Sequence, residues 1–186
     1  MKTLVTKRLI LRDLRLTDLK AFHAYAKKPN IGPAAGWAPH KSLEDSNKIL
    51  KMMIHEQEVW AITHKLDDVL IGTIGLHVRN FDNAIENRKE IGYVLDDLYW
   101  GQGLMVEAVY KVLEYGFKTL ELDEITCGHA VTNLRSKRVI EKTGFTYSHM
   151  EIRQDAYQND IEIMMYVIRL KDYKEMLEND KLKTKV

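Results

Sequence analysis

EIGYVLDDLYWGQGLMVEAV, residues 90–109, is the stretch of sequence that decides the fold. It begins with a run typical of a buried strand, passes through a loop containing Gly101 and Gly103, and ends in a helix with apolar residues at helical spacing from Leu104. A strand that leads through a glycine loop into a helix start leaves a row of backbone N–H groups without partners. Because such a row binds phosphate well, this stretch predicts a phosphate-binding loop.

The rest of the chain divides into short strands and amphipathic helices around this stretch. The patterns predict strands near residues 9–12, 59–63, 69–78, 90–95, 124–130, 145–152 and 161–170, and helices near 17–28, 43–55, 104–120 and 133–144. This order predicts a single α/β (α+β) domain over residues 1–186, with a mixed sheet and helices on its faces. The core is expected over about 7–170, and the polar tail 171–186 is expected to fray as a short helix.

Composition limits the classes of partner. The 186 residues carry 28 basic and 27 acidic side chains, so a formal net charge of +1 gives no support for nucleic-acid or membrane binding by a global field. No apolar run approaches the roughly 20 residues of a membrane span, and the first residues lack a signal-peptide layout. The single cysteine, Cys127, allows no internal disulfide, so we expect a cytoplasmic protein.

The glycine loop alone does not separate a plain turn from a ligand site. It lacks the third glycine of a dinucleotide fingerprint and the Gly-Lys-Ser/Thr of a nucleotide P-loop. The segment Trp100–Met105, WGQGLM, followed by Glu107 and Ala108, resembles the acetyl-coenzyme A loop of the GNAT N-acetyltransferase superfamily, which has the form Arg/Gln-x-x-Gly-x-Gly/Ala. The RimJ/RimL branch, the N-terminal acetyltransferases of ribosomal proteins, is the most similar. Three further segments agree with it: KRLILR at 7–12, EIGYVL at 90–95, and NLRS at 133–136 continued by EKTGF at 141–145.

The resemblance covers about residues 7–168 and implies a fold, a co-substrate and a set of contacts. The implied fold is GNAT-like, with a mostly antiparallel sheet and helices on both faces. The implied co-substrate is acetyl-coenzyme A (acetyl-CoA), with no metal. The first amides of the helix would hold its pyrophosphate, and the strand before the loop would splay from its neighbour to hold the pantetheine arm. The expected coenzyme contacts are Val94, Leu95, Trp100, Gly101, Gln102, Gly103, Leu104, Met105, Val106, Asn133 and Arg135.

Two departures from the family pattern bear on the chemistry. Met105 stands where the motif has glycine or alanine, so its side chain must point away from the coenzyme. Ile140 stands where many GNAT enzymes have a tyrosine that acts as the general acid. Ser136 is therefore the substitute candidate for the acid that protonates the leaving thiolate. The alternative is a serine that only hydrogen-bonds to the backbone at a helix start.

Glu90 is the first candidate for the general base. It shares a strand face with Gly92 and Val94, and the glycine leaves space for a substrate or a water. The alternative is a glutamate held in a salt bridge by Arg88 or Lys89. Glu151, Asp155 and Glu162 are further carboxylates near the last two strands. His77 and His129 fall in strands and are interpreted as core or cleft groups, and the seven histidines show no metal-ligand spacing.

Other residues have two interpretations each. Asn133 caps a helix and either serves only as a cap or also bonds the pantetheine amides. Arg135 either reaches the coenzyme phosphates or lies on a solvated helix face. The loop 29–39, PNIGPAAGWAP, is either structural or part of the acceptor site, with Trp37 and the following His40 as candidate substrate-binding residues.

These observations predict an N-acetyltransferase that moves an acetyl group from acetyl-CoA directly to a primary amine. The expected acceptor is a protein N-terminal amine of the ribosomal-protein type. The alternatives are a small amine, such as a polyamine, an aminoglycoside-like compound or an amino-acid conjugate, and a non-catalytic acyl-CoA-binding module. The sequence leaves the oligomeric state open, with a homodimer as one option.

Overall fold

The computed structural model describes residues 1–79 and 87–183. One sheet of eight strands forms the centre of the molecule, in the order β1-β2-β3-β4-β5-β6-β8-β7. The strands are β1 (Leu4–Val5), β2 (Leu9–Asp13), β3 (Val59–His64), β4 (Leu70–His77), β5 (Arg88–Leu95), β6 (Glu124–Ala130), β7 (Thr146–Gln154) and β8 (Asp160–Arg169). Neighbours are antiparallel except β5 and β6, so the predicted mixed, mostly antiparallel sheet is confirmed.

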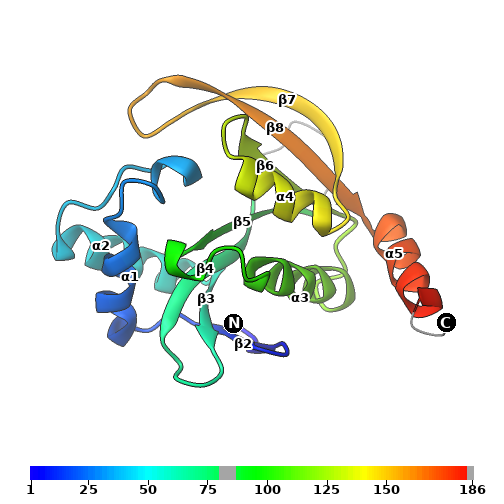
Figure 1. The fold of residues 1–186 in the computed structure, drawn as a ribbon, viewed down its shortest axis with the longest axis horizontal. Coiled ribbons are helices and arrows are strands. Elements are labelled where there is room, and N and C mark those ends of the chain that lie inside the picture. Colours follow the sequence, from blue (N-terminus) through cyan, green and yellow to red (C-terminus); the bar gives the residue numbers. More distant parts are fainter. Residues whose placement is uncertain (80–86, 184–186) are drawn as a thin grey trace.

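Helices cover both faces of this sheet (Figure 1). They are α1 (Leu19–Ala26), α2 (Leu43–Glu56), α3 (Leu104–Lys118), α4 (Leu134–Lys142) and α5 (Leu170–Lys183), with short 3-10 turns η1 (Leu16–Asp18), η2 (Pro33–Ala35) and η3 (Asp97–Tyr99). Within the described residues no helix is both long and apolar enough to cross a membrane.

Strand β3 shows how the two faces are filled, because its side chains alternate between two hydrophobic cores. Trp60 and Ile62 point into the larger core, which holds the buried face of α3. Val59 and Ala61 point into a smaller core beneath α1 and α2. Period-2 alternation in one strand thus separates the face that carries α3 and α4 from the face that carries α1 and α2.

The C-terminal helix is longer than the sequence predicts. Helix α5 follows β8 directly and has 14 residues. Tyr173 is 4% exposed, and its ring stacks on Phe117 of α3 with 4.9 Å between the ring centroids. Local polarity indicated a fraying tail, but a stacked aromatic pair fixes the first turn of the helix to the core.

Candidate active site

The glycine loop has the conformation that the sequence predicts. Gly101 and Gly103 have φ of +76° and +73°, a region in which a side chain is strained. Gly103 is the N-cap of α3, and no side chain caps this helix start. The first backbone N–H groups of α3 therefore have no side-chain partner, which is the arrangement expected for binding an anion.

Arg8, in the connection between β1 and β2, holds this loop. Its Nη1 donates to the carbonyl oxygen of Gln102 at 2.9 Å, and its Nε donates to Glu107 Oε2 at 2.7 Å. Glu107 also accepts from the backbone N–H of Arg8 and from the Thr6 hydroxyl. Burial acts to raise the pKa of Glu107, but these hydrogen bonds outweigh it and lower the pKa. The Gln102 carbonyl of the loop thus binds Arg8, and the first amides of α3 do not take part in this contact. Arg8 was not among the predicted site residues, although it is the second residue of the family-like segment KRLILR.

Strands β5 and β6 separate beside the loop. Their parallel ladder pairs only Arg88–Glu90 with Glu124–Thr126. The rest of β5, which includes Val94 and Leu95, pairs with β4 alone, and Cys127–Ala130 pairs with β8 alone. The splay that the family resemblance implies is therefore present. The Leu95 carbonyl accepts a hydrogen bond from the Trp100 indole at 2.8 Å, which fixes the tryptophan at the end of the opening.

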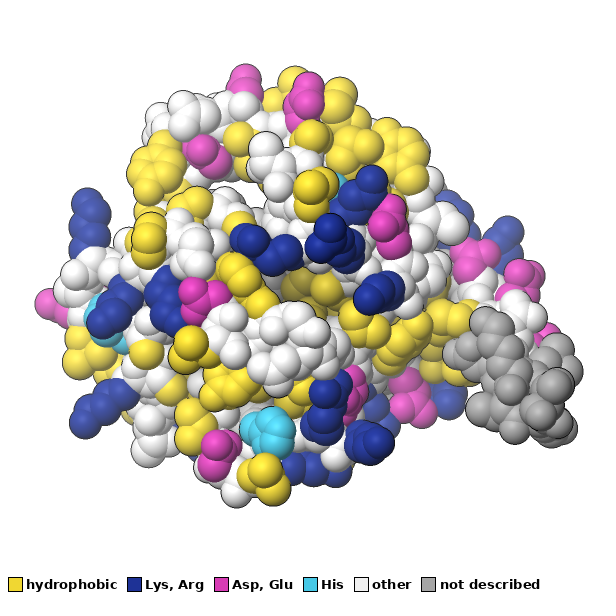
Figure 2. Space-filling model, viewed as in Figure 1, with side chains coloured by type: hydrophobic (Ala, Val, Ile, Leu, Met, Phe, Trp, Pro, Cys, Tyr) yellow, Lys and Arg dark blue, Asp and Glu magenta, His cyan; other side chains and the backbone are white. Residues whose placement is uncertain are grey.

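An open cleft of about 830 Å³ runs through this gap. Figure 2 shows the molecule hollowed beneath the arch of β7 and β8, with Lys and Arg side chains gathered beside the hollow over α4. Every site residue predicted from the sequence lines the cleft except Gln102, whose side chain donates to the Leu98 carbonyl instead. Arg138, Lys142, Arg153 and Arg79 also line it and were not predicted.

The Met105 side chain points away from the cleft, as the sequence requires. Met105 is 6% exposed and Leu104 is 2% exposed, and both belong to the larger core. Their side chains anchor the helix start from below, so only their backbone is available to a ligand.

The start of α4 forms the opposite wall. Asn133 is the N-cap, with Oδ1 accepting from the Ser136 N–H at 3.1 Å. Its Nδ2 donates to the Ala34 carbonyl at 2.9 Å, which joins α4 to the turn η2. Arg135 places its guanidinium carbon 4.0 Å from the centroid of the Trp100 ring. Arg135 therefore stacks on the tryptophan of the glycine loop while its side chain stays exposed, and its contact with the coenzyme phosphates stays a prediction.

Ser136 has a partner that the sequence did not indicate. Its Oγ lies 3.0 Å from the hydroxyl of Tyr93, which projects from β5. Burial raises the pKa of Tyr93 well above its ordinary value, so the phenol keeps its proton. Ile140 stands at the family's tyrosine position, and the fold instead places the phenol of Tyr93 from β5 beside Ser136.

Glu90 lies where the two strands begin to separate, and it is 6% exposed. Arg153 of β7 contacts both carboxylate oxygens, at 2.9 and 2.8 Å, and Arg79 lies 3.6 Å from Oε1. The hydrogen bonds to Glu90 raise the pKa of Arg153 despite its burial. Glu90 is therefore salt-bridged, but its partners are Arg153 and Arg79. Arg88, which the sequence offered as a partner, pairs with Glu124 instead. The basic role of Glu90 stays a prediction.

Trp37 and His40 lie together on one wall of the cleft. Their ring centroids are 5.0 Å apart, and both line the cleft. His40 Nδ1 lies 2.8 Å from Ser46 Oγ of α2. Burial, together with the nearby His23, lowers the pKa of His40. The loop 29–39 thus packs on α2 and forms a wall of the cleft. Within residues 1–79 and 87–183, no group of three or more His, Cys, Asp or Glu side chains is arranged to hold a metal ion.

Fold and cleft agree with one family of enzymes. Residues 8–146 match the acetyltransferase (GNAT) domain, and the chain belongs to this family. It is similar to uncharacterized N-acetyltransferase YoaA of Bacillus subtilis (strain 168), with 30% identity over 161 residues, 84% of this chain and 89% of the relative. It is also similar to uncharacterized N-acetyltransferase p20 of Bacillus licheniformis, with 29% identity over 150 residues, 78% of this chain and 83% of the relative.

A solved structure supports the same fold. The acetyltransferase (GNAT family) from Bacillus anthracis superposes with a TM-score of 0.82 at 23% identity, covering 91% of this chain and 99% of that one. The protein is therefore a GNAT-fold acyltransferase of the N-acetyltransferase class.

Proposed function

We propose that this enzyme transfers an acetyl group from acetyl-CoA to the N-terminal amine of a protein. The use of acetyl-CoA rests on one observation. The hydrogen-bonded pairing of β5 with β6 stops after three residues, beside the uncapped start of α3. Free strand edges suit the two amides of a pantetheine arm, and free helix amides suit a pyrophosphate. Arg138 and Lys142 of α4 add positive charge along the same wall.

The transfer requires three tasks, and the cleft offers groups for each. The acceptor amine must lose a proton, for which Glu90 is the base predicted from sequence. The acetyl oxygen needs a hydrogen bond as it gains charge, which a free amide of β5 near Val94 can donate. The coenzyme sulfur needs a proton as it leaves, for which we propose Ser136, with Tyr93 hydrogen-bonded to it.

Two observations favour an N-terminal amine as the acceptor. Putative ribosomal N-acetyltransferase YdaF of Bacillus subtilis (strain 168) is 40% identical over 80 residues, 42% of each chain. In the cleft, the carboxylate of Glu90 is already paired with Arg153. An extended polyamine carries several positive charges and needs several acidic partners. Because arginines neutralise the carboxylate of Glu90, the cleft suits the single ammonium group of a protein N-terminus better.

A small polyamine is the second candidate, and a relative supports it. Spermidine N(1)-acetyltransferase of Vibrio cholerae serotype O1 is 25% identical over 142 residues, 76% of this chain and 80% of the relative. This relative is less identical than YdaF but matches a longer part of the chain, so the experiment includes a polyamine as an acceptor.

The test is release of coenzyme thiol from acetyl-CoA with three acceptors: a peptide beginning with serine, a peptide beginning with alanine, and spermidine. We expect turnover that depends on the amine, with higher kcat/KM for a peptide than for spermidine. Preference for spermidine would overturn the N-terminal assignment. Tight binding of acetyl-CoA without turnover on any acceptor would instead favour the non-catalytic alternative.

A further inference from the structure

The imidazole of His77 lies over two glycines on the acceptor side of the cleft. His77 ends strand β4, and its neighbours across the sheet lie on β5. A methyl group added at Gly75 would meet His77 Nε2 at 2.8 Å, and one added at Gly92 would meet it at 3.4 Å. The ring therefore occupies space that side chains at Gly75 and Gly92 would fill. The two glycines thus leave room for the imidazole beside the strands that line the cleft.

A carboxylate orients this ring. His77 Nδ1 lies 3.2 Å from Glu58 Oε2, and the other oxygen of Glu58 accepts a hydrogen bond from the Val78 N–H at 3.3 Å. The carboxylate accepts the Nδ1 proton, so the lone pair of the neutral ring is on Nε2. Among the described residues nothing hydrogen-bonds to Nε2, and the His77 side chain is 30% exposed. Nε2 is thus free to accept a proton.

The position of Nε2 matches the place where an acceptor amine must lie. Gly92 belongs to the part of β5 that has left the β6 ladder. Val94, whose backbone is the predicted contact of the acetyl group, lies two residues further along the strand, about 7 Å away. An amine nitrogen at hydrogen-bond distance from Nε2 and at contact distance from the acetyl carbon fits within that span.

Glu90 is less free than His77 to take this role, although the two residues are partners across the strands. Both oxygens of Glu90 are bound by Arg153. A proton transfer to Glu90 would require that bidentate pair to open, whereas Nε2 of His77 needs no rearrangement.

We propose that His77, oriented by Glu58, is the general base of the acetyl transfer. The acceptor ammonium gives one proton to Nε2, and the nitrogen lone pair then attacks the thioester carbonyl carbon. The C–N bond forms and the C–S bond breaks, and a second proton leaves the nitrogen and ends on the coenzyme sulfur. The imidazolium releases the first proton to solvent, so each turnover yields an amide, a thiol and one proton. This inference rests on the proposed function.

Several charged groups share the surroundings of His77 and will contribute to any pH profile. Glu58 immediately precedes β3, Glu90 belongs to β5, and Arg153 belongs to β7. Arg79 follows β4, and Glu56 ends α2 and lines the cleft. A change of pH profile is therefore informative only when variants at His77 and Glu90 are compared.

The test compares His77→Gln, His77→Ala and Glu90→Gln in the full-length enzyme with the best of the three amines. His64→Gln is the matched control, because His64 also ends a strand but lies outside the cleft. We expect His77→Gln to lower kcat by about 100-fold and to remove the acid limb of the kcat/KM profile, with KM for acetyl-CoA unchanged. Added imidazole should restore part of the rate of His77→Ala, because the removed ring leaves room beside Gly92.

The outcomes separate this inference from the proposed function. If the wild type releases no thiol with any amine, the proposed function fails and this inference fails with it. If the wild type turns over but Glu90→Gln, and not His77→Gln, removes the acid limb, only the inference is wrong. A loss of rate in His77→Ala that imidazole does not restore, together with a lowered melting temperature, would assign His77 a structural role.

Discussion

At the residue scale, the contact between Tyr93 and Ser136 gives a direct test of the acid. Ser136→Ala should lower kcat by about 100-fold if Ser136 donates the proton to sulfur. Tyr93→Phe removes the hydroxyl 3.0 Å from Ser136 Oγ, and it should lower kcat about tenfold because Ser136 loses its orientation. If the two act as one unit, the double variant should be no slower than Ser136→Ala alone. If the kcat losses of the two single variants multiply in the double variant, Ser136 and Tyr93 do not act as one unit. Steady-state kcat of the three variants decides it.

The raised pKa of Tyr93 adds a condition on pH to the same pair. A phenol with a pKa well above its ordinary value stays protonated at pH 9, so it causes no fall in rate on the alkaline side of neutrality. An alkaline limb near pH 9 that disappears in Tyr93→Phe would contradict this assignment. The measurement is the kcat profile of the wild type beside that of Tyr93→Phe.

At the element scale, we predict that the glycine loop and the start of helix α3 together bind the coenzyme pyrophosphate. Gly101→Ala and Gly103→Ala each place a side chain at positive φ, which costs roughly 1–2 kcal/mol of strain or shifts the loop. We expect the dissociation constant of CoA to rise about tenfold, since the amides of α3 move with the loop. Gly36→Ala is the matched control, because Gly36 also has a positive φ, +86°, and no atom within 4 Å of an added Cβ, and it lies in the loop 29–39. Calorimetric titration with CoA should show an unchanged dissociation constant for Gly36→Ala. Equal losses of CoA affinity in all three variants would contradict the prediction.

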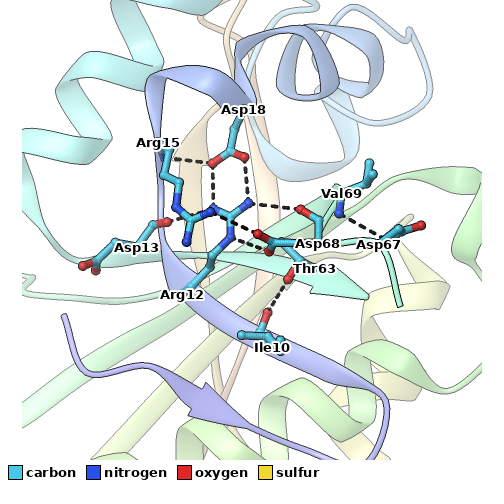
Figure 3. A network of polar contacts seen from close by, with 9 residues as sticks. All are labelled: Ile10, Arg12, Asp13, Arg15, Asp18, Thr63, Asp67, Asp68 and Val69. Carbon is cyan, nitrogen blue, oxygen red and sulfur yellow. Dashed lines mark hydrogen bonds and ion pairs between the residues drawn. The ribbon is translucent and has the colours of Figure 1, made fainter. Parts of the chain in front are cut away.

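At the scale of the whole molecule, a buried charge network joins strand β2 to the segments beside it (Figure 3). Arg12, 5% exposed, donates to both oxygens of Asp18 at 2.9 and 2.8 Å and to Asp68 at 2.7 Å. It thereby joins β2, η1 and the turn between β3 and β4. Arg12→Ala would leave the buried Asp18 carboxylate unpaired, at a cost of about 3–5 kcal/mol.

Such a loss corresponds to a fall in melting temperature of roughly 10 °C for a chain of this size. The double variant Arg12→Ala/Asp18→Ala should recover part of it, because it removes the unpaired charge as well. Thermal unfolding of both variants tests this, and a double variant less stable than Arg12→Ala would contradict the explanation.

The same network predicts a direction for acid sensitivity. Hydrogen bonds from Arg12 lower the pKa of Asp68 below its ordinary 3.8. A carboxylate whose folded pKa is lowered stabilises the fold above its unfolded pKa, and this stability is lost as the pH falls through the folded value. Unfolding free energy should therefore decline below pH 3.8, and less so in Asp68→Asn. An equal decline in both proteins would assign the acid sensitivity to other groups.

The sequence by itself predicted most of the longer elements, the glycine loop and the family. Period-2 and period-3.6 patterns and the residues of the motifs are local in the chain, so strands such as β3 and the cap Asn133 follow from neighbours a few positions away. Helix α5 was underestimated because its stability comes from the distant ring of Phe117.

Only the tertiary structure decided which side chains meet in the cleft. The pairs Glu90 with Arg153, Tyr93 with Ser136 and His77 with Glu58 join residues 19 to 63 positions apart. Their contacts depend on strand order and register, which place β4, β5 and β7 around one opening. A local pattern can mark where a strand ends, but it carries no information on which distant charge will lie beside it.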